Sequence, residues 1–214
     1  MKLPILYSFK RCPYAMRARM ALKLADIKCE LREIRLNNKP DHMLKVSPKG
    51  TVPVLILEDR IIDESMEIVN WVISLENIFD NAISKEKIEI TESLILDFDN
   101  DFKHHLDRYK YSTRYKEVDL EKHRSVCMQM LIKIEDIASK GNWFFGKNIS
   151  KLDISIFPFI RQFRNVDDKW FDSFNFNFLK KWLFQIIDSN DFLSIMKKYE
   201  KWESKNIPIY TNFL

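Results

Sequence analysis

The chain has 214 residues, of which 46% are hydrophobic and 31% charged, so it can bury a substantial core and is not a disordered chain. Its 3 glycines are too few and too widely spaced for a glycine-rich phosphate-binding loop. The 35 Lys and Arg exceed the 31 Asp and Glu only slightly, and the signs are interspersed. This pattern predicts a solvated surface and argues against a nucleic-acid-binding stripe.

The cysteines and histidines favour neither a disulfide framework nor a metal site. The 3 cysteines, Cys12, Cys29 and Cys127, are an odd number and lie far apart, as is typical of a reducing compartment. No cysteine pair has zinc-ligand spacing, and we interpret the 4 histidines as surface or core residues. The chain shows no signal peptide and no membrane-spanning run. We therefore expect a soluble, cytoplasmic protein with no metal, membrane or nucleic-acid partner.

The first third of the chain predicts a mixed α/β domain, because short apolar runs alternate with helical patterns. In chain order we expect strand 3–8, helix 13–25, strand 28–36, helix 41–46, strand 52–57, a strand around 61–62 and helix 65–76. Short joints between the first two strands and their helix imply a parallel, right-handed crossover. The order β-α-β-α-β-β-α fits a thioredoxin-like unit with a parallel pair and an antiparallel hairpin in one sheet.

The helix expected at 13–25 begins at Pro13, where a proline loses no intrahelical hydrogen bond. Arg17, Arg19 and Lys23 are expected on its polar side. Its alanines and Leu22 are expected on the packed side.

The rest of the chain predicts helices. Apolar residues recur at helical spacing from Ile88 to Tyr109 and from Val126 to Ile137. Ser150 to Asp153 forms a capping box before an apolar run. The expected divisions are a thioredoxin-like domain at 1–76, a linker at 77–84 and an all-helical domain at 85–214.

Cys12 stands between the end of a strand and the start of a helix. Backbone N–H groups at a helix start stabilise an anion, and Lys10 and Arg11 add positive charge, so the reactive thiolate is favoured. Ala15 stands where a dithiol redox protein has its second cysteine. Cys12 therefore needs an external thiol to resolve a mixed disulfide. For the other two cysteines we favour a buried structural role.

Val52-Pro53 places a proline at the start of an expected sheet strand. A cis bond there turns the Val52 backbone toward Cys12 and offers its N–H and C=O to an extended peptide. The sequence leaves the isomer open, since cis is the minority state before proline.

The segment Asp63-Glu64-Ser65 lies where a strand turns into a helix. The helix start and the Ser65 hydroxyl suit a carboxylate, and Glu64 suits an ammonium, so together they fit an amino-acid head group. The simpler alternative is that Ser65 or Asp63 only caps the helix.

In combination these residues resemble the cytosolic glutathione S-transferase family, most closely its cysteine-type, omega-like branch in a bacterial-like form. The resemblance covers nearly the whole chain and is strongest up to Trp71. The segments that carry it are Leu6-Tyr7-Ser8, Cys12-Pro13-Tyr14-Ala15 with Arg17 and Arg19, Asn38-Lys39-Pro40, Pro48 to Leu55, Glu64-Ser65, Ser150 to Asp153 and Pro158 to Phe163.

The resemblance implies a site for glutathione as co-substrate, with Cys12 as the nucleophile that forms a mixed disulfide. It also implies a homodimer and an unidentified second substrate that binds between the domains. The residues implied to bind glutathione are Tyr14 through its backbone, Lys39 at the glycine carboxylate, Val52 and Pro53 at the cysteinyl backbone, and Glu64 and Ser65 at the γ-glutamyl head.

We therefore expect a glutathione-dependent thiol transferase that reduces mixed disulfides or a substrate such as dehydroascorbate. Two alternatives stay open. A conjugating transferase adds glutathione to electrophiles, with Tyr7 rather than Cys12 as the activating residue. A non-catalytic relative binds a protein partner, although such a protein has no need to retain Cys12, Lys39 and Glu64 together.

Overall fold

The computed structural model describes residues 2–79, 84–116, 119–138 and 141–213. These residues form two compact units. The sheet unit comprises residues 1–78 and 188–214, and the helical unit comprises residues 79–187. Half of the linker expected at 77–84, residues 80–83, lies outside the described residues.

The sheet unit contains a mixed sheet in the order β4-β3-β1-β2-β5. Its strands are β1 (Ile5–Ser8), β2 (Cys29–Glu33), β3 (Val54–Ile56), β4 (Ile61–Ile62) and β5 (Ile209–Thr211). β1 pairs in parallel with β2, and the other neighbours are antiparallel. The first four strands confirm the predicted thioredoxin-like arrangement. The central strand β1 is apolar at successive positions because both faces of the sheet are covered.

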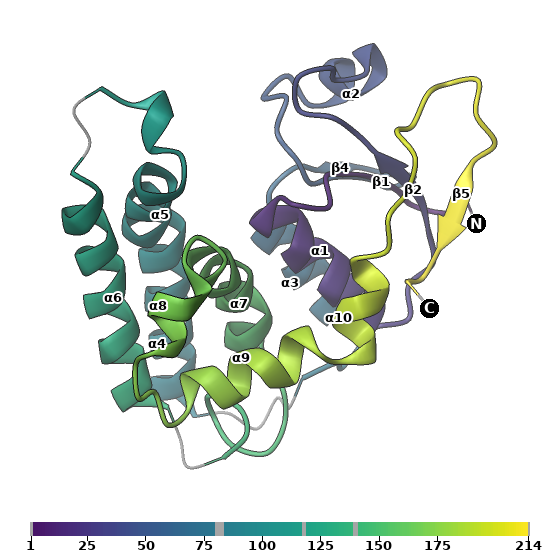
Figure 1. The fold of residues 1–214 in the computed structure, drawn as a ribbon. Helices are drawn as coiled ribbons and strands as arrows, with labels where there is room; N and C mark the ends of the chain where they lie inside the picture. The colour runs from purple at the N-terminus through teal and green to yellow at the C-terminus, as the bar shows by residue number, and fades with distance from the viewer. Residues whose placement is uncertain (1, 80–83, 117–118, 139–140, 214) are drawn as a thin grey trace. The chain divides into compact units, whose positions relative to one another are not determined.

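Helices cover the two faces of this sheet. One face carries α1 (Pro13–Leu24), α3 (Ser65–Leu75) and α10 (Asn190–Ile195), and α2 (Asp41–Val46) lies on the other (Figure 1). The bounds of α1, α2 and α3 agree with the predicted ranges to within a residue.

The predicted polar side of α1 is wrong in part, because Arg17 and Arg19 are both fully buried. α1 packs against α3 and α10, so little of its surface faces water. Arg19 donates to the Ser8 hydroxyl (2.7 Å) and the Ile195 carbonyl oxygen (2.9 Å), and forms an ion pair with Glu33. These three partners compensate the desolvation of the guanidinium.

The end of the chain also differs from the prediction of a helical domain over 85–214. After α10 the chain returns to the sheet, and β5 pairs antiparallel with β2, with Tyr210 opposite Glu30. β5 thereby covers the N–H and C=O groups that β2 presents at the sheet edge. β5 has only three residues, between a proline and an asparagine, and they carry no strand pattern of their own. The pairing with β2 therefore determines their conformation.

The helical unit confirms the predicted helical periodicity. Its helices are α4 (Lys85–Asp97), α5 (Lys103–Lys110), α6 (Leu120–Ile137), α7 (Lys151–Arg164), α8 (Asp168–Asp172) and α9 (Leu179–Ile187), with the π-helical turn η1 (Phe98–Phe102) and the 3₁₀ turn η2 (Ser112–Arg114). α7 is the central helix of this unit, since residues 152–160 are all buried. Phe102 is a core residue stacked on Phe98 (ring centroids 4.4 Å apart).

The predicted capping box at the start of α7 is confirmed. The Asp153 carboxylate accepts hydrogen bonds from the Ser150 backbone N–H (2.7 Å), the Trp182 indole N–H (2.7 Å) and the Phe144 backbone N–H (3.2 Å). One buried side chain thus joins the start of α7 to α9 and to the preceding turn.

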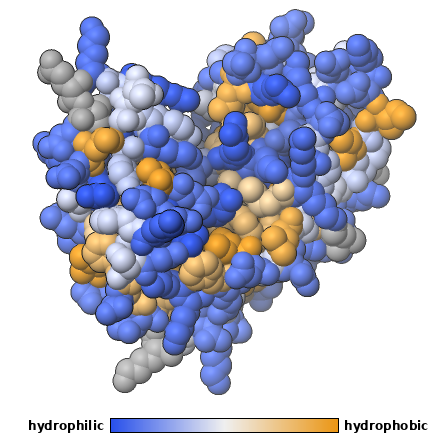
Figure 2. All heavy atoms as spheres, viewed as in Figure 1, coloured by the Kyte–Doolittle hydropathy of each residue, from blue (hydrophilic) through white to orange (hydrophobic). Residues whose placement is uncertain are grey.

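Hydrophilic residues predominate on the face of the molecule in Figure 2, and hydrophobic residues form small separate patches there. Across the described ranges, none of the helices combines the length with the apolar character that crossing a bilayer requires.

Candidate active site around Cys12

Cys12 is the N-cap residue of α1. Its backbone is extended (φ −77°, ψ 124°), and its carbonyl oxygen accepts the first helical hydrogen bond from the Met16 N–H (3.0 Å). The helix-start dipole therefore points at the cysteine, and the first turn of α1 holds no acidic residue to offset it. The residue is half-buried, in contrast to the other two cysteines. The structure thus places Cys12 at the helix start, the position on which the prediction of a reactive thiolate rests.

The Cys12 thiol lies against the start of β3, forty residues away in sequence. Its sulfur donates to the Val52 carbonyl oxygen at 3.5 Å. The Val52-Pro53 peptide bond is cis, which the sequence had left open. The structure thus brings together three residues predicted to share a site, and Val52 and Pro53 are themselves buried.

The other two cysteines have a different environment. Cys29 in β2 and Cys127 in α6 are both fully buried. Burial raises the pKa of each thiol to about 12. The structural role predicted for both is consistent with this environment, which leaves Cys12 as the candidate reactive thiol.

The segment 63–65 does not cap α3 with a side chain. Glu64 occupies the N-cap position, and no side chain makes the cap hydrogen bond there. Asp63 instead accepts from the Ser47 hydroxyl (2.8 Å), and the buried Ser65 hydroxyl accepts from an Arg17 Nη1 at 3.4 Å. The simpler capping interpretation of Asp63 and Ser65 is therefore wrong.

The Glu64 carboxylate already binds an ammonium group. Lys49 Nζ donates to Glu64 at 2.7 Å and to Asp63 at 3.0 Å. Hydrogen bonds to these two carboxylates raise the pKa of Lys49 to about 12. The Ser47 hydroxyl, followed by the Lys49 ammonium, lowers the pKa of Asp63. Sequence reasoning did not single out Lys49, because a lysine in an exposed turn carries no pattern.

The two remaining residues predicted to bind glutathione, Lys39 and Tyr14, lie in the loop before α2 and in the first turn of α1. Lys39 is half-buried in the loop before α2, and its side chain runs beside Gly50, whose φ of +63° suits glycine. Tyr14 is half-buried in the first turn of α1, with its ring centroid 5.5 Å from the Arg17 guanidinium carbon.

Tyr7, the rival catalytic residue, is fully buried. Its hydroxyl accepts from Arg32 Nη1 (2.7 Å) and is 2.9 Å from His42 Nδ1. Burial raises the pKa of the Tyr7 phenol. These partners and this pKa favour a structural role over the activation of a thiol.

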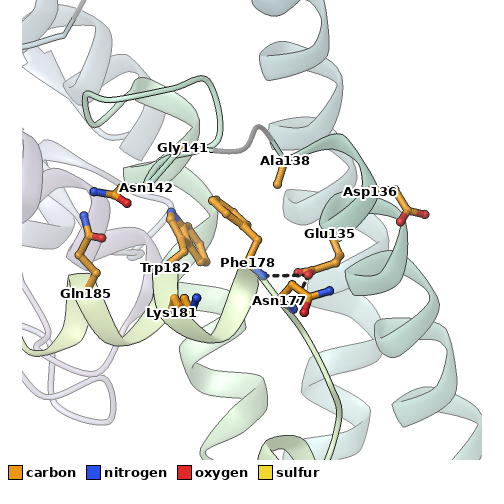
Figure 3. Close-up of a pocket in the computed structure, with 10 residues that line it drawn as sticks. All are labelled: Glu135, Asp136, Ala138, Gly141, Asn142, Asn177, Phe178, Lys181, Trp182 and Gln185. Atoms are coloured by element: carbon orange, nitrogen blue, oxygen red, sulfur yellow. Dashed lines mark hydrogen bonds between the residues drawn. The ribbon is translucent and has the colours of Figure 1, made fainter.

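A separate pocket of about 520 Å³ lies in the helical unit (Figure 3). At one side of it Glu135, from α6, accepts backbone N–H bonds from Asn177, Phe178 and Leu179 at 2.6–2.8 Å, which caps the start of α9. The other side chains around the pocket are Asp136, Ala138, Asn142, Lys181, Trp182 and Gln185. Ala138 and Gly141 border residues 139–140, which lie outside the described ranges, so we assign this pocket no ligand.

Two protein-family models match this chain. The model described as the glutathione S-transferase N-terminal domain matches residues 6–80, and the C-terminal domain model matches residues 112–202. The two matches together include Cys12, Val52 and Glu64 and most of the helical unit.

Curated relatives match over segments of different length. A probable glutathione transferase from Aplysia californica is 39% identical over 57 residues, which span 27% of this chain and 62% of the relative. The probable glutathione S-transferase parA of Nicotiana tabacum is 24% identical over 76% of this chain and 74% of its own length. The glutathione S-transferase omega-2 of Rattus norvegicus is 46% identical over 50 residues, which span 23% of this chain and 20% of that protein. The match thus spans less than two thirds of the Aplysia and rat proteins.

Solved structures share the fold. The tau-class glutathione S-transferase of Mangifera indica has a TM-score of 0.78 at 23% identity. The match covers 91% of this chain and 93% of the Mangifera chain. A glutathione transferase family member from Pseudomonas fluorescens, solved with two glutathione bound, also has a TM-score of 0.78, at 16% identity over 91% of this chain and 92% of its own.

Proposed function

Because the chain belongs to the glutathione S-transferase family, we propose that it is a glutathione-dependent thiol transferase of the omega-like type, with Cys12 as the nucleophile. One observation carries the proposal. A half-buried cysteine caps the start of α1 while its sulfur contacts the carbonyl of Val52, next to a cis-proline. That arrangement joins an activated sulfur to a backbone edge that suits an extended peptide.

The proposed reaction consists of two thiol–disulfide exchanges. In the first, the Cys12 thiolate attacks the glutathione sulfur of a mixed disulfide. A Cys12–glutathione disulfide forms, the substrate S–S bond breaks, and the substrate leaves as a thiolate that takes a proton from water. In the second, the thiolate of another glutathione attacks the bound glutathione sulfur, which releases glutathione disulfide and regenerates the Cys12 thiolate. The second thiol comes from solution because Ala15 offers no resolving sulfur.

We propose that glutathione binds along the Cys12 side of the sheet unit. The Val52 backbone pairs with the cysteinyl residue of glutathione beside Pro53, and the Tyr14 backbone contributes near the sulfur. Glu64, which already pairs with the Lys49 ammonium, binds the α-ammonium of the γ-glutamyl head. The Ser65 hydroxyl and the N–H groups at the start of α3 bind its carboxylate. Lys39 binds the glycine carboxylate.

The first test is the intact mass of the protein after incubation with oxidised glutathione, followed by peptide mapping. We expect one glutathionyl adduct, on Cys12. The matched controls are internal, since Cys29 and Cys127 are buried thiols with a pKa of about 12. Equal labelling of the three cysteines, or a native protein unlabelled at Cys12, contradicts the proposal.

The second test is turnover. We expect Cys12→Ser to abolish reduction of a glutathione mixed disulfide while it spares conjugation of glutathione to a model electrophile. Tyr7→Phe is the control for the conjugating alternative, and we expect it to leave the kcat of thiol transfer at saturating glutathione within about twofold of the parent. Thiol transfer that survives Cys12→Ser removes Cys12 from the reaction.

We also propose that the protein acts in the cytoplasm as a homodimer. None of Cys12, Cys29 and Cys127, all of which are described, forms a disulfide, which supports a reducing compartment. Light scattering coupled to size exclusion measures the mass in solution, and a mass of one chain contradicts the dimer.

A further inference from the structure

The C-terminal segment 196–213 folds back onto β2, beside the proposed glutathione site. Its Trp202 backbone N–H donates to the Glu33 carbonyl oxygen at 2.7 Å, and β5 pairs with the same strand further along. In Figure 1 the segment leaves α10, passes on the α2 side of the sheet and ends as the edge strand β5. Trp202 packs against the buried cluster that contains Met43 of α2, so its contacts lie on the sheet face that carries α2.

Trp202 and Tyr7 both pack against the Arg32 guanidinium. The Arg32 guanidinium carbon is 4.4 Å from the Trp202 ring centroid and 5.2 Å from the Tyr7 ring centroid. The two rings themselves meet edge to face, with centroids 5.8 Å apart. The side chain of Glu30 accepts from Arg32 Nε at 2.6 Å and completes the arginine's surroundings. Two aromatic faces and an ion pair thus fix the direction in which Arg32 donates.

From Arg32 the contacts continue to α2. Arg32 Nη1 donates to the Tyr7 hydroxyl at 2.7 Å, and the hydroxyl is 2.9 Å from His42 Nδ1. His42 is the second residue of α2 and lies three residues after Lys39. A helix of six residues has little stability of its own, so its position depends on such tertiary contacts.

The same residues pack against the sulfur site. Tyr7, Met43 and Val52 belong to one buried cluster, and Cys12 and Trp202 are partly buried against it. The C-terminal segment therefore touches the cluster that supports the Val52 backbone, in addition to the polar contacts that lead to α2.

We propose that Trp202 is a positioning residue for glutathione binding. It acts through Arg32, Tyr7 and His42 to hold the loop that carries Lys39. The inference rests on the proposed function, since it concerns the site that we assign to glutathione. It extends that function by making the C-terminal segment part of the binding site.

The test is Trp202→Ala, with glutathione binding measured by calorimetry and steady-state kinetics measured with a glutathione mixed disulfide. We expect the Kd and KM for glutathione to rise about tenfold, from loss of the Arg32 stack. The kcat at saturating glutathione and the KM for the disulfide substrate are expected to change by less than about twofold. Trp202→Phe keeps an aromatic face and restores most of the affinity. Tyr210→Ala, an exposed position in the same segment, is the matched control and leaves both constants unchanged.

Two further measurements separate positioning from a general structural role. Trp202→Ala is expected to speed hydrogen exchange of residues 41–46, and its effect on Kd is expected to shrink in a Lys39→Ala background. An unchanged Kd, or full additivity with Lys39→Ala, overturns the inference. If the parent protein binds no glutathione, the proposed function fails. In that case the exchange of residues 41–46 still decides whether Trp202 positions α2, because it needs no ligand.

Discussion

Three cysteines of identical chemistry differ in reactivity because of their surroundings. Cys12 is half-buried at the positive end of a helix, whereas Cys29 and Cys127 are shielded from water. With a pKa of about 12, only about one in 10⁴ of the buried thiols is ionised at pH 8. We therefore expect any selectivity of labelling for Cys12 to follow from solvation as much as from the helix dipole.

At the same scale, Asp63 makes stability depend on pH. The Ser47 hydroxyl and the Lys49 ammonium lower the pKa of Asp63 below its ordinary value near 4. A depressed pKa stabilises the folded state at pH values above the ordinary one, and this contribution is lost as the pH falls through the folded value. We expect the carboxyl titration of Asp63, followed by NMR, to move upward in Ser47→Ala. An unchanged titration rules out the hydroxyl as the main cause.

Cys12 and Val52 were predictable as neighbours, because a cysteine at a helix start and a proline at a strand start are local patterns with a chemical reason. The pairing of Lys49 with Glu64 was not predictable, since both are exposed charges in turns. Three histidines also come together, with His105 Nδ1 2.7 Å from His123 Nδ1 and the His104 ring next to both. Eighteen residues separate His105 from His123, and no local pattern links two helices in that way.

At the scale of elements, the start of α7 has the clearest local cause. The capping box lies within four residues, so the sequence alone predicted it. The sequence did not predict that the same Asp153 carboxylate also accepts from Trp182 and Phe144, because those contacts depend on how α7 and α9 pack.

We predict that Asp153→Ala costs about 3 kcal/mol of unfolding free energy, because four buried donors, including the Ser150 hydroxyl, lose their acceptor. Ser150→Ala removes a cap hydroxyl and is expected to cost about 1 kcal/mol. Urea unfolding of the two variants compares these losses. Equal losses for the pair imply that Asp153 acts only as a cap.

The partly wrong polar side predicted for α1 has a similar origin. Arginine usually indicates an exposed face, but even Lys23 on the same helix keeps only 13% of its side chain exposed. Arg17 and Arg19 are buried because α3 and α10 lie over them. α10 is more than 160 residues away in sequence. The pattern within residues 13–25 therefore could not predict that α10 packs against α1.

At the scale of the whole molecule, Arg19 connects distant parts of the sheet unit. Its guanidinium contacts Ser8 in β1, Glu33 in β2 and the last residue of α10, Ile195. The Phe213 ring centroid lies 5.8 Å from its central carbon. Residues from both ends of the chain thus meet at one side chain.

We expect Arg19→Met to lower the free energy of unfolding by about 3–5 kcal/mol, because it leaves the Glu33 carboxylate without its buried cation. Lys23→Ala is the matched control on the same helix. Its nitrogen is 3.9 Å from Asp191 at a partly exposed position, so its loss is expected to cost at most about 1 kcal/mol. Chemical denaturation followed by circular dichroism measures both. A similar small loss for the two variants contradicts the connecting role of Arg19.

The discontinuous sheet unit also sets an order of events during protein synthesis. Four of its strands lie within the first 62 residues, whereas β5 is translated more than 140 residues later. The helical unit, which is contiguous, leaves the ribosome in between. Throughout that interval the outer edge of β2 lacks its partner β5. An unpaired strand edge can pair with other nascent chains during that time. Chaperones that bind extended segments thus have a defined period in which to act on this protein.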